Sequence, residues 1–350
     1  MKKYNSTEYQ NKVLRSRAEQ LLAKKKDEAA QTMDGMRVII PPIKSQGIKT
    51  KLVTWIRALV PDISGRWIEP FFGTGVVAIN SGFQKAILGD TNPHIIRFYK
   101  AIQKGEITPS IVREYLTREG EKLRKAANNG YGHFTFVKDR FNREHDPLDF
   151  LFLSRAGFNG MMRFNKKGEW NIPFCQKPER FSSSYITKIV NQVRDTLCLI
   201  QPDWLFLNQP FEEIISLATE RDFIYCDPPY MGRYVDYYSG WTEDDECRLF
   251  ELLSNTKAKF ILSTWHHNDY RKNEMVQKYW RHFNIVTRDH FYHAGGKIEN
   301  RRAIVEALVF NFPAYIQKHN HGVEPKPEQL MLCEEREKYI AQSLSRAGVV

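Results

Sequence analysis

Short apolar runs alternate with segments of helical spacing along most of the chain. The runs have the length of single buried strands and lie at residues 66–72, 85–88, 204–207, 222–226, 260–264, 283–286 and 304–312. Helix-compatible spacing lies between most of them, as at 76–80 and 210–219. Strands that alternate with helices are typical of an α/β fold with a parallel, doubly wound sheet, which is the architecture we predict.

The alternation stops between residues 106 and 194, so we interpret that stretch as a second domain inserted into the first. The sheet domain then consists of residues 37–105 and 195–313. Residues 1–36 are polar with apolar positions at roughly helical spacing, which predicts a helical N-terminal extension. The last part of the chain, 314–350, predicts a helical tail.

The chain has a formal net charge of +11, and much of the excess lies in the inserted stretch. Residues 121–194 hold fourteen Lys or Arg against seven Asp or Glu, which gives +7 of the +11. Aromatic residues lie among these cations, a composition suited to neutralising phosphates and stacking on bases. The charge therefore indicates a polyanionic partner, although a basic solvated face is the alternative that composition leaves open.

Composition also argues against several classes of protein and site. No apolar run approaches the roughly 18 residues of a membrane span, and the N-terminus lacks the apolar stretch of a secretory signal. We therefore expect a cytoplasmic protein with no membrane partner. The five cysteines form no CxxC pair, and the histidines lack acidic residues at metal-site spacing, so we expect no metal.

A glycine loop follows the first apolar run, in the segment EPFFGTG at 69–75. Gly73 and Gly75 stand where a chain that leaves a strand must turn and let its backbone approach a ligand, although any tight turn can need them. Asp90 ends the next run, where nucleoside-binding folds bond a ribose diol. The loop lacks a full GxGxxG pattern, which favours a nucleoside without a pyrophosphate. S-adenosylmethionine fits that description.

A second motif, Asp227-Pro228-Pro229-Tyr230, follows a strand and so lies where open α/β sheets place ligands. The prolines donate no N–H and leave carbonyl oxygens to face a substrate amine. The adenine amine is a poor nucleophile, and two hydrogen bonds, to Asp227 and to the Pro228 carbonyl, would favour its tetrahedral form. Tyr230 can stack on an extruded base. A proline-rich turn with a capping aspartate is the structural alternative.

Together these motifs resemble the alpha-group, Dam-like DNA adenine-N6 methyltransferases of restriction-modification type. The similarity runs over residues 41–312. KSQGIK at 44–49 is similar to the family's KWxGGK, the 69–75 loop to EPFxGxG, and 88–99 to LxDxNxxLIxxY. The segment 155–174 is similar to FNGLxRxNxxGxFNVP, and 227–230 is the family's DPPY. Five motifs in the family's order make the resemblance specific.

The resemblance implies a Rossmann-like methyltransferase sheet, interrupted at 106–194 by a mostly helical target-recognition domain that carries a β-hairpin. It implies a catalytic tetrapeptide of Asp227, Pro228, Pro229 and Tyr230. The residues implied to bind S-adenosylmethionine are Ser45, Lys49, Glu69, Phe71, Gly73, Gly75, Asp90, Phe211 and Asp227. Ser45 stands where the family has a tryptophan and Ile48 where it has a glycine, so this part of the cofactor contact departs from the pattern.

The inserted domain is implied to recognise double-stranded DNA. The implied DNA-binding residues are Lys44, Phe158, Asn159, Arg163, Asn165, Lys166 and Lys167. Gly160, Asn165 and Gly168 would supply the turns of the hairpin. Arg163 could bond O6 and N7 of a guanine, and Phe158 could wedge into the base stack. The alternatives are a phosphate contact or salt bridge for Arg163, hairpin core for Phe158, and a solvated charge for Lys44.

The expected function is transfer of a methyl group from S-adenosylmethionine to the exocyclic amine of a flipped-out adenine in duplex DNA. Serine in place of Asp227 is usually associated with cytosine amines, and asparagine with RNA or protein amides. A DNA-binding module with a degenerate cofactor site is the alternative of a different class, raised by Ser45 and Ile48. The sequence leaves open the target site, the oligomeric state and a cognate restriction endonuclease that shares the site.

Overall fold

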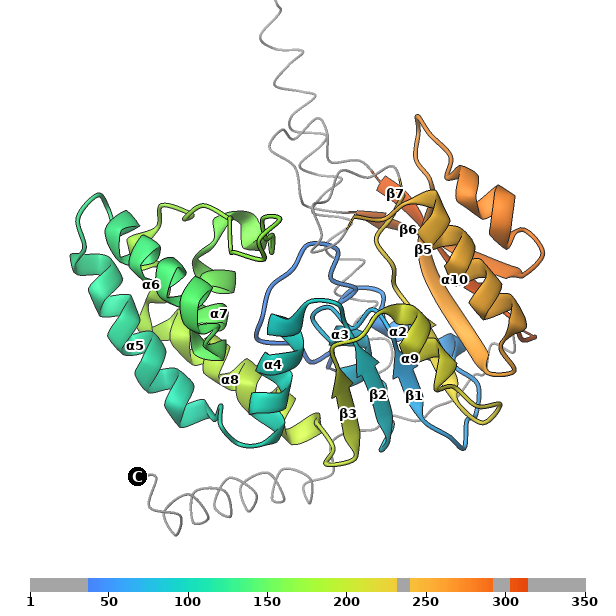
Figure 1. The fold of residues 1–350 in the computed structure, drawn as a ribbon, viewed down its shortest axis with the longest axis horizontal. Helices are drawn as coiled ribbons and strands as arrows, with labels where there is room; N and C mark the ends of the chain where they lie inside the picture. The colour runs from blue at the N-terminus through green and yellow to red at the C-terminus, as the bar shows by residue number, and fades with distance from the viewer. Residues whose placement is uncertain (1–36, 232–239, 292–302, 314–350) are drawn as a thin grey trace, which may run out of the picture.

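The computed structural model describes residues 37–231, 240–291 and 303–313 and centres on one seven-stranded sheet (Figure 1). The sheet has the order β3-β2-β1-β4-β5-β7-β6. Its strands are β1 (Trp67–Glu69), β2 (Ala86–Gly89), β3 (Trp204–Leu207), β4 (Phe223–Cys226), β5 (Lys259–His267), β6 (Asn284–Phe291) and β7 (Ala303–Phe310). Each apolar run overlaps one strand, which confirms the α/β prediction. The predicted terminal helices, in 1–36 and 314–350, lie outside the described residues.

The prediction of a wholly parallel sheet is wrong at one edge. Strands β3, β2, β1, β4 and β5 are parallel neighbours. Strand β7 instead runs antiparallel to both β5 and β6. The reason lies in the connection between β6 and β7, because a parallel pair needs a crossover of about a dozen or more residues, usually with a helix. Eleven residues separate β6 from β7, about the lower limit for such a crossover, whereas antiparallel neighbours need only a short connection.

Helices cover both faces of the sheet, so the doubly wound prediction is confirmed. Alternate residues of β1 show the two sides, because Trp67 belongs to one buried cluster and Ile68 to the other. The first face packs against α2 (Val53–Leu59), α3 (Val76–Ile79) and α4 (Pro93–Gln103). The second packs against α9 (Phe211–Ser216), α10 (Glu243–Asn255) and the π-helix η3 (Val276–Trp280). No helix of the described ranges is long and apolar enough to cross a membrane.

The inserted stretch is mostly helical and lies beside α4 in Figure 1. Its helices are α5 (Pro109–Lys125), α6 (Tyr131–Glu144), α7 (Pro147–Ala156) and α8 (Ser183–Leu199), with the short 3-10 turns η1 (Phe158–Gly160) and η2 (Pro178–Phe181). Proline at the first position and a side-chain cap start two of them, since Thr108 and Asp146 accept backbone N–H groups there. Helix α8 continues past residue 194 toward β3.

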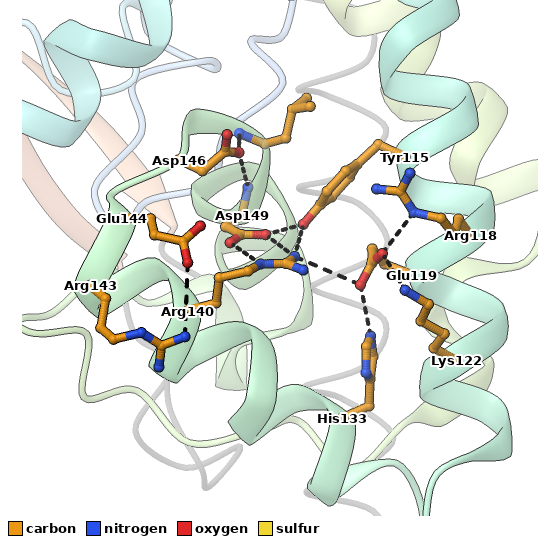
Figure 2. A network of polar contacts seen from close by, with 11 residues as sticks. Tyr115, Arg118, Glu119, Lys122, His133, Arg140, Arg143, Glu144, Asp146 and Asp149 are labelled. Carbon is orange, nitrogen blue, oxygen red and sulfur yellow. Dashed lines mark hydrogen bonds and ion pairs between the residues drawn. The ribbon is translucent and has the colours of Figure 1, made fainter.

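A buried polar network holds α5, α6 and α7 together (Figure 2). His133 Nε2 lies 3.0 Å from Glu119 Oε2. Arg140 Nε donates to Asp149 Oδ2 at 2.7 Å, and the Tyr115 hydroxyl also donates to Asp149. Burial alone would raise the pKa of Glu119, but hydrogen bonds from His133 and two cations outweigh it and lower the pKa to about 2. Because breaking a buried ion pair is strongly destabilising, the network fixes these helices relative to one another.

The predicted hairpin exists in a looser form than regular strands. Asn165 and Gly168 close its tip as expected: Asn165 Oδ1 accepts the backbone N–H groups of Lys167 and Glu169, and Gly168 has a φ of 77°. The η1 turn interrupts one arm, and Pro173 in the other has no N–H to donate. The arms therefore pair only at two antiparallel bridges, Gly157 with Phe174 and Phe164 with Trp170.

Candidate active site

A cavity of about 310 Å³ lies at the carboxyl ends of β1, β2 and β4. The strand order reverses between β1 and β4, and open α/β sheets bind ligands at such a switch point. Eight of the nine predicted cofactor residues line this cavity: Ser45, Lys49, Glu69, Phe71, Gly73, Asp90, Phe211 and Asp227. Gly75 lies behind the wall and shapes the loop. Pro229 of the predicted catalytic tetrapeptide also lines the cavity.

The glycine loop needs glycine at two positions. Gly73 and Gly75 have φ values of 52° and 73°, in the left-handed region that favours glycine. A Cβ on Gly75 would lie 2.3 Å from the Phe72 ring, whereas a Cβ on Gly73 would meet nothing within 4 Å. The Tyr99 hydroxyl donates to the Thr74 carbonyl and anchors the loop from α4. The loop is thus tightly packed at Gly75 and open beside Gly73.

Asp90 joins the loop to the end of β2. Its Oδ2 accepts the Gly73 N–H at 2.8 Å, and its Oδ1 accepts the Asn92 N–H at 2.8 Å. Burial raises the pKa of Asp90 to about 6, although these two hydrogen bonds act against the shift. Each carboxylate oxygen has a further lone pair. The pair of oxygens can therefore accept two hydroxyl groups from a ligand in the cavity.

Three aromatic side chains form one wall of the cavity. Phe71 and Phe211 are stacked with ring centres 5.3 Å apart, and Trp241 meets each of them at 5.5 Å. Trp241 Nε1 donates to Glu246 of α10 at 2.8 Å, which fixes the indole. Sequence reasoning missed Trp241, and its only signal was an aromatic directly before a helix-capping threonine. Such a wall suits a flat heterocycle.

The far end of the cavity contains the predicted catalytic aspartate, already in contact with a cation. Lys49 Nζ lies 2.8 Å from Asp227 Oδ1 and 4.8 Å from the centre of the Tyr230 ring. The Tyr230 hydroxyl donates to Glu306 of β7 at 2.7 Å. Sequence reasoning missed Glu306, because it lies inside a strand far from any motif. The tetrapeptide is thus held by two residues from distant parts of the chain.

Carboxyl groups dominate the electrostatics of this cavity. Burial raises the pKa of Asp227, an effect that Lys49 opposes. Burial also raises the pKa of Glu69 well above its usual range, although Trp67 Nε1 donates to Glu69 Oε2 at 2.9 Å. Five carboxyl groups line the cavity beside two cations, Lys49 and Arg248, and this acidic excess favours a cationic ligand; they belong to Glu69, Asp90, Glu212, Asp227 and Asp245. Within 37–231, 240–291 and 303–313, no group of three His, Cys, Asp or Glu could hold a metal ion.

Residues 45–294 match the family described as D12 class N6 adenine-specific DNA methyltransferases. The chain belongs to this family. The Type II methyltransferase M.FokI of Planomicrobium okeanokoites is 28% identical over 284 residues, which cover 78% of this chain and 43% of that protein. The DNA adenine methylase of Vibrio cholerae serotype O1 is 28% identical over 225 residues, 61% of this chain and 76% of that protein. The DNA adenine methylase of Haemophilus influenzae is 30% identical over 196 residues, which cover 54% of this chain and 63% of that protein.

The hairpin of this D12-class chain presents several of the predicted DNA-binding residues. Phe158 is 49% exposed, and Asn159 is exposed beside it with a φ of 54°. Lys166 and Lys167 are exposed at the tip. Arg163 is half-buried, and its Nε donates to Asn171 Oδ1 at 2.9 Å, so its guanidinium is oriented along the hairpin. These residues share one segment, as predicted, but their contacts with DNA remain a prediction.

Two other predicted residues of the D12-class chain are engaged within the protein. The Asn165 side chain closes the hairpin tip and its Nδ2 donates to Glu169 at 2.8 Å. Lys44 is half-buried, with its Nζ 5.8 Å from the centre of the Tyr185 ring. Both side chains therefore also make contacts within the protein.

The hairpin also reaches the cavity, through a residue that sequence reasoning missed. Met162 lines the cavity, and its sulfur accepts a hydrogen bond from Asn92 Nδ2 at 3.5 Å. Asn92 in turn donates to Asp90 through its backbone and caps α4. The hairpin of the D12-class chain thus contributes to the wall of the cavity.

Proposed function

We propose that this protein is a cytoplasmic, site-specific DNA methyltransferase that transfers a methyl group from S-adenosylmethionine to the exocyclic amine of an adenine flipped out of duplex DNA. The observation that carries the proposal is that an aromatic wall, a hydroxyl-binding carboxylate and Asp227 all line one cavity. Ser45 and Ile48 line the same cavity without filling it. We therefore favour an enzyme over a DNA-binding module with a degenerate cofactor site.

The lining fits S-adenosylmethionine group by group. Phe71, Phe211 and Trp241 would hold the adenine, and Asp90 would accept the ribose hydroxyls. The acidic remainder of the site would favour the positive sulfonium. The cofactor supplies an electrophilic methyl group, so the remaining task of the protein is to activate and orient the amine.

Asp227 and the Pro228 carbonyl would perform that task by accepting the two hydrogens of the amine. The lone pair of the nitrogen is then directed toward the methyl group, and Asp227 can take the proton released once the N–C bond has formed. The amine must displace Lys49, whose Nζ lies 2.8 Å from Asp227 Oδ1. Tyr230, held by Glu306, would stack on the flipped base.

Recognition would come from the hairpin, with Arg163 on a guanine edge and Phe158, Lys166 and Lys167 against the duplex. The test is methylation of oligonucleotide duplexes with labelled S-adenosylmethionine, followed by nucleoside analysis. We expect N6-methyladenine at one sequence, with a loss of about 1–3 kcal/mol of discrimination at one base pair in Arg163→Ala. Methylated cytosine, or no product on any duplex, would contradict the proposal. A cognate restriction endonuclease that reads the same sequence is the partner we expect.

Cofactor affinity should fall at low pH because of Asp90. Its carboxylate must be ionised to accept both ribose hydroxyls, and its pKa is raised to about 6. Binding of S-adenosylmethionine should therefore be nearly constant above pH ~7 and weaken by roughly tenfold per pH unit well below the pKa. Isothermal titration calorimetry from about one unit below this pKa to about two units above it measures this. Asp90→Asn should bind more weakly and show a flatter profile, and an equally steep profile in that variant would exclude Asp90 as the titrating group.

A further inference from the structure

Three cations meet around one tyrosine behind the η1 turn. Arg155 comes from the end of α7, Arg180 from η2, and Lys44 from the segment that leads into the cofactor cavity. Lys44 Nζ lies 5.8 Å and Arg180 Cζ 5.4 Å from the centre of the Tyr185 ring, and Arg180 Nη2 lies 3.5 Å from the Tyr185 hydroxyl. We call these four residues the Tyr185 cluster.

The positive charge of the Tyr185 cluster is not balanced by a carboxylate in the part of the chain that the structure describes. Arg155 is 1% exposed, yet it donates only to neutral groups, the Pro42 carbonyl and Gln192 Oε1, each at 2.5 Å, and the tyrosine hydroxyl. The Nε of Arg180 is buried and has no hydrogen-bond partner. Burying unpaired charge is costly. By contrast, Arg140 in the same helical unit is paired with Asp149.

The pKa values of Lys44 and Tyr185 also reflect the neighbouring positive charges. Burial lowers the pKa of Lys44, and Arg155 and Arg180 lower it further against the opposing effect of Tyr185. Burial would raise the pKa of Tyr185, but Arg155 and Lys44 outweigh it and lower the pKa to about 8. The lowered pKa of Tyr185, which the neighbouring cations cause against the effect of burial, indicates a positive local potential, and such a potential attracts an anion.

The position of the cluster indicates which anion would bind. The side chain of Lys44 packs against Gly160 of η1, where a Cβ would lie 3.1 Å from Lys44 Cδ. The exposed Phe158 and Asn159 belong to that same turn. Lys44, Arg180 and Tyr185 are each half-buried, so the cluster has an outer side that a ligand can contact.

We propose that the Tyr185 cluster binds one phosphate of the DNA backbone. Lys44 and Arg180 contact the phosphate, while Arg155 and Tyr185 position them. The proposal rests on the DNA-binding function proposed above. Because the segment after Lys44 lines the cofactor cavity, this contact ties the backbone of the DNA to the edge of the active site.

The test is the salt dependence of binding to a duplex of random sequence, followed by fluorescence anisotropy. Each neutralised phosphate contributes about −0.9 to the slope of log K against log salt. Because Lys44 and Arg180 share the phosphate, Arg180→Gln should make the slope shallower by up to about 0.9 and weaken binding equally on all duplexes, and Lys44→Gln should act in the same direction. Arg180→Lys should keep most of the slope. Lys104→Gln, which removes an exposed cation at the end of α4, is the matched control and should leave the slope unchanged.

The possible results distinguish a failure of the proposed phosphate site from a failure of the proposed DNA-binding function. If Arg180→Gln and Lys44→Gln leave the wild-type slope, with or without a change in affinity, no phosphate binds the Tyr185 cluster. If Arg180→Gln melts at a much lower temperature than the wild type, the salt slopes of Arg180→Lys and Lys44→Gln test the phosphate site in its place. A wild-type protein that binds no duplex DNA at all would instead overturn the proposed function.

Discussion

Replacing Asp227 with alanine is expected to abolish methyl transfer while leaving DNA binding almost unchanged. The variant removes one of the two acceptors for the adenine amine, and loss of such a preorganised electrostatic contact costs about 10²- to 10³-fold or more in rate. Asp227→Asn should be nearly as damaging, because an amide cannot take the released proton. Single-turnover transfer of a labelled methyl group measures the effect, and DNA affinity is measured in parallel.

The matched control for this experiment is Asp203→Ala, which removes an exposed carboxylate at the opposite end of the sheet, directly before β3. It should transfer methyl groups at the wild-type rate. Turnover by Asp227→Ala close to that of Asp203→Ala would refute the mechanism. A parallel loss of DNA affinity in Asp227→Ala would mean that the residue acts through the structure of the site.

Gly75→Ala is expected to lose most of the cofactor affinity. The new Cβ would meet the Phe72 ring at 2.3 Å, and Phe72 is itself buried under the loop. Overpacking of this kind costs about 1–3 kcal/mol, and about 1.4 kcal/mol corresponds to tenfold in affinity. The left-handed backbone adds roughly 1–2 kcal/mol of strain to the fold. We expect S-adenosylmethionine to bind roughly ten- to a hundredfold more weakly by calorimetry.

The control variant Gly82→Ala separates the effect of the clash with Phe72 from the effect of backbone strain. Gly82 also has a positive φ, of 82°, but a Cβ there would meet nothing within 4 Å. This control should melt at a somewhat lower temperature and bind the cofactor normally. If both variants bind the cofactor equally well, the packing of Phe72 does not shape the binding loop.

The parts of the site that were predictable are those that stand at the ends of strands. Gly73, Asp90 and Asp227 each follow an apolar run, and parallel strands bring their carboxyl ends to one edge of the sheet. Trp241 and Glu306 could not be found in this way. Their contacts with Phe71 and Tyr230 depend on how distant segments pack, and the local sequence around them contains no motif.

In the fold, too, features set by the local sequence were predictable, and features set by the packing of distant segments were not. Alternating runs and helical segments predicted every strand of the sheet, but they do not determine strand direction, so the antiparallel β7 was missed. Turn chemistry predicted the hairpin tip at Asn165 and Gly168, because those residue types act locally. It did not predict that η1 would interrupt an arm, since that depends on how the turn packs on Lys44.

The contact between Met162 and Asn92 has a thermodynamic consequence. Met162 belongs to the hairpin that we propose to read DNA and also lines the cavity that we propose to bind the cofactor. If the proposed function holds, a shift of the hairpin on DNA therefore changes the surroundings of the cofactor. By linkage, the factor by which DNA changes cofactor affinity must equal the factor by which the cofactor changes DNA affinity. On the proposed function, we therefore expect binding of the target DNA and binding of the methyl donor to be coupled, with the Met162 thioether as one contact between the two sites.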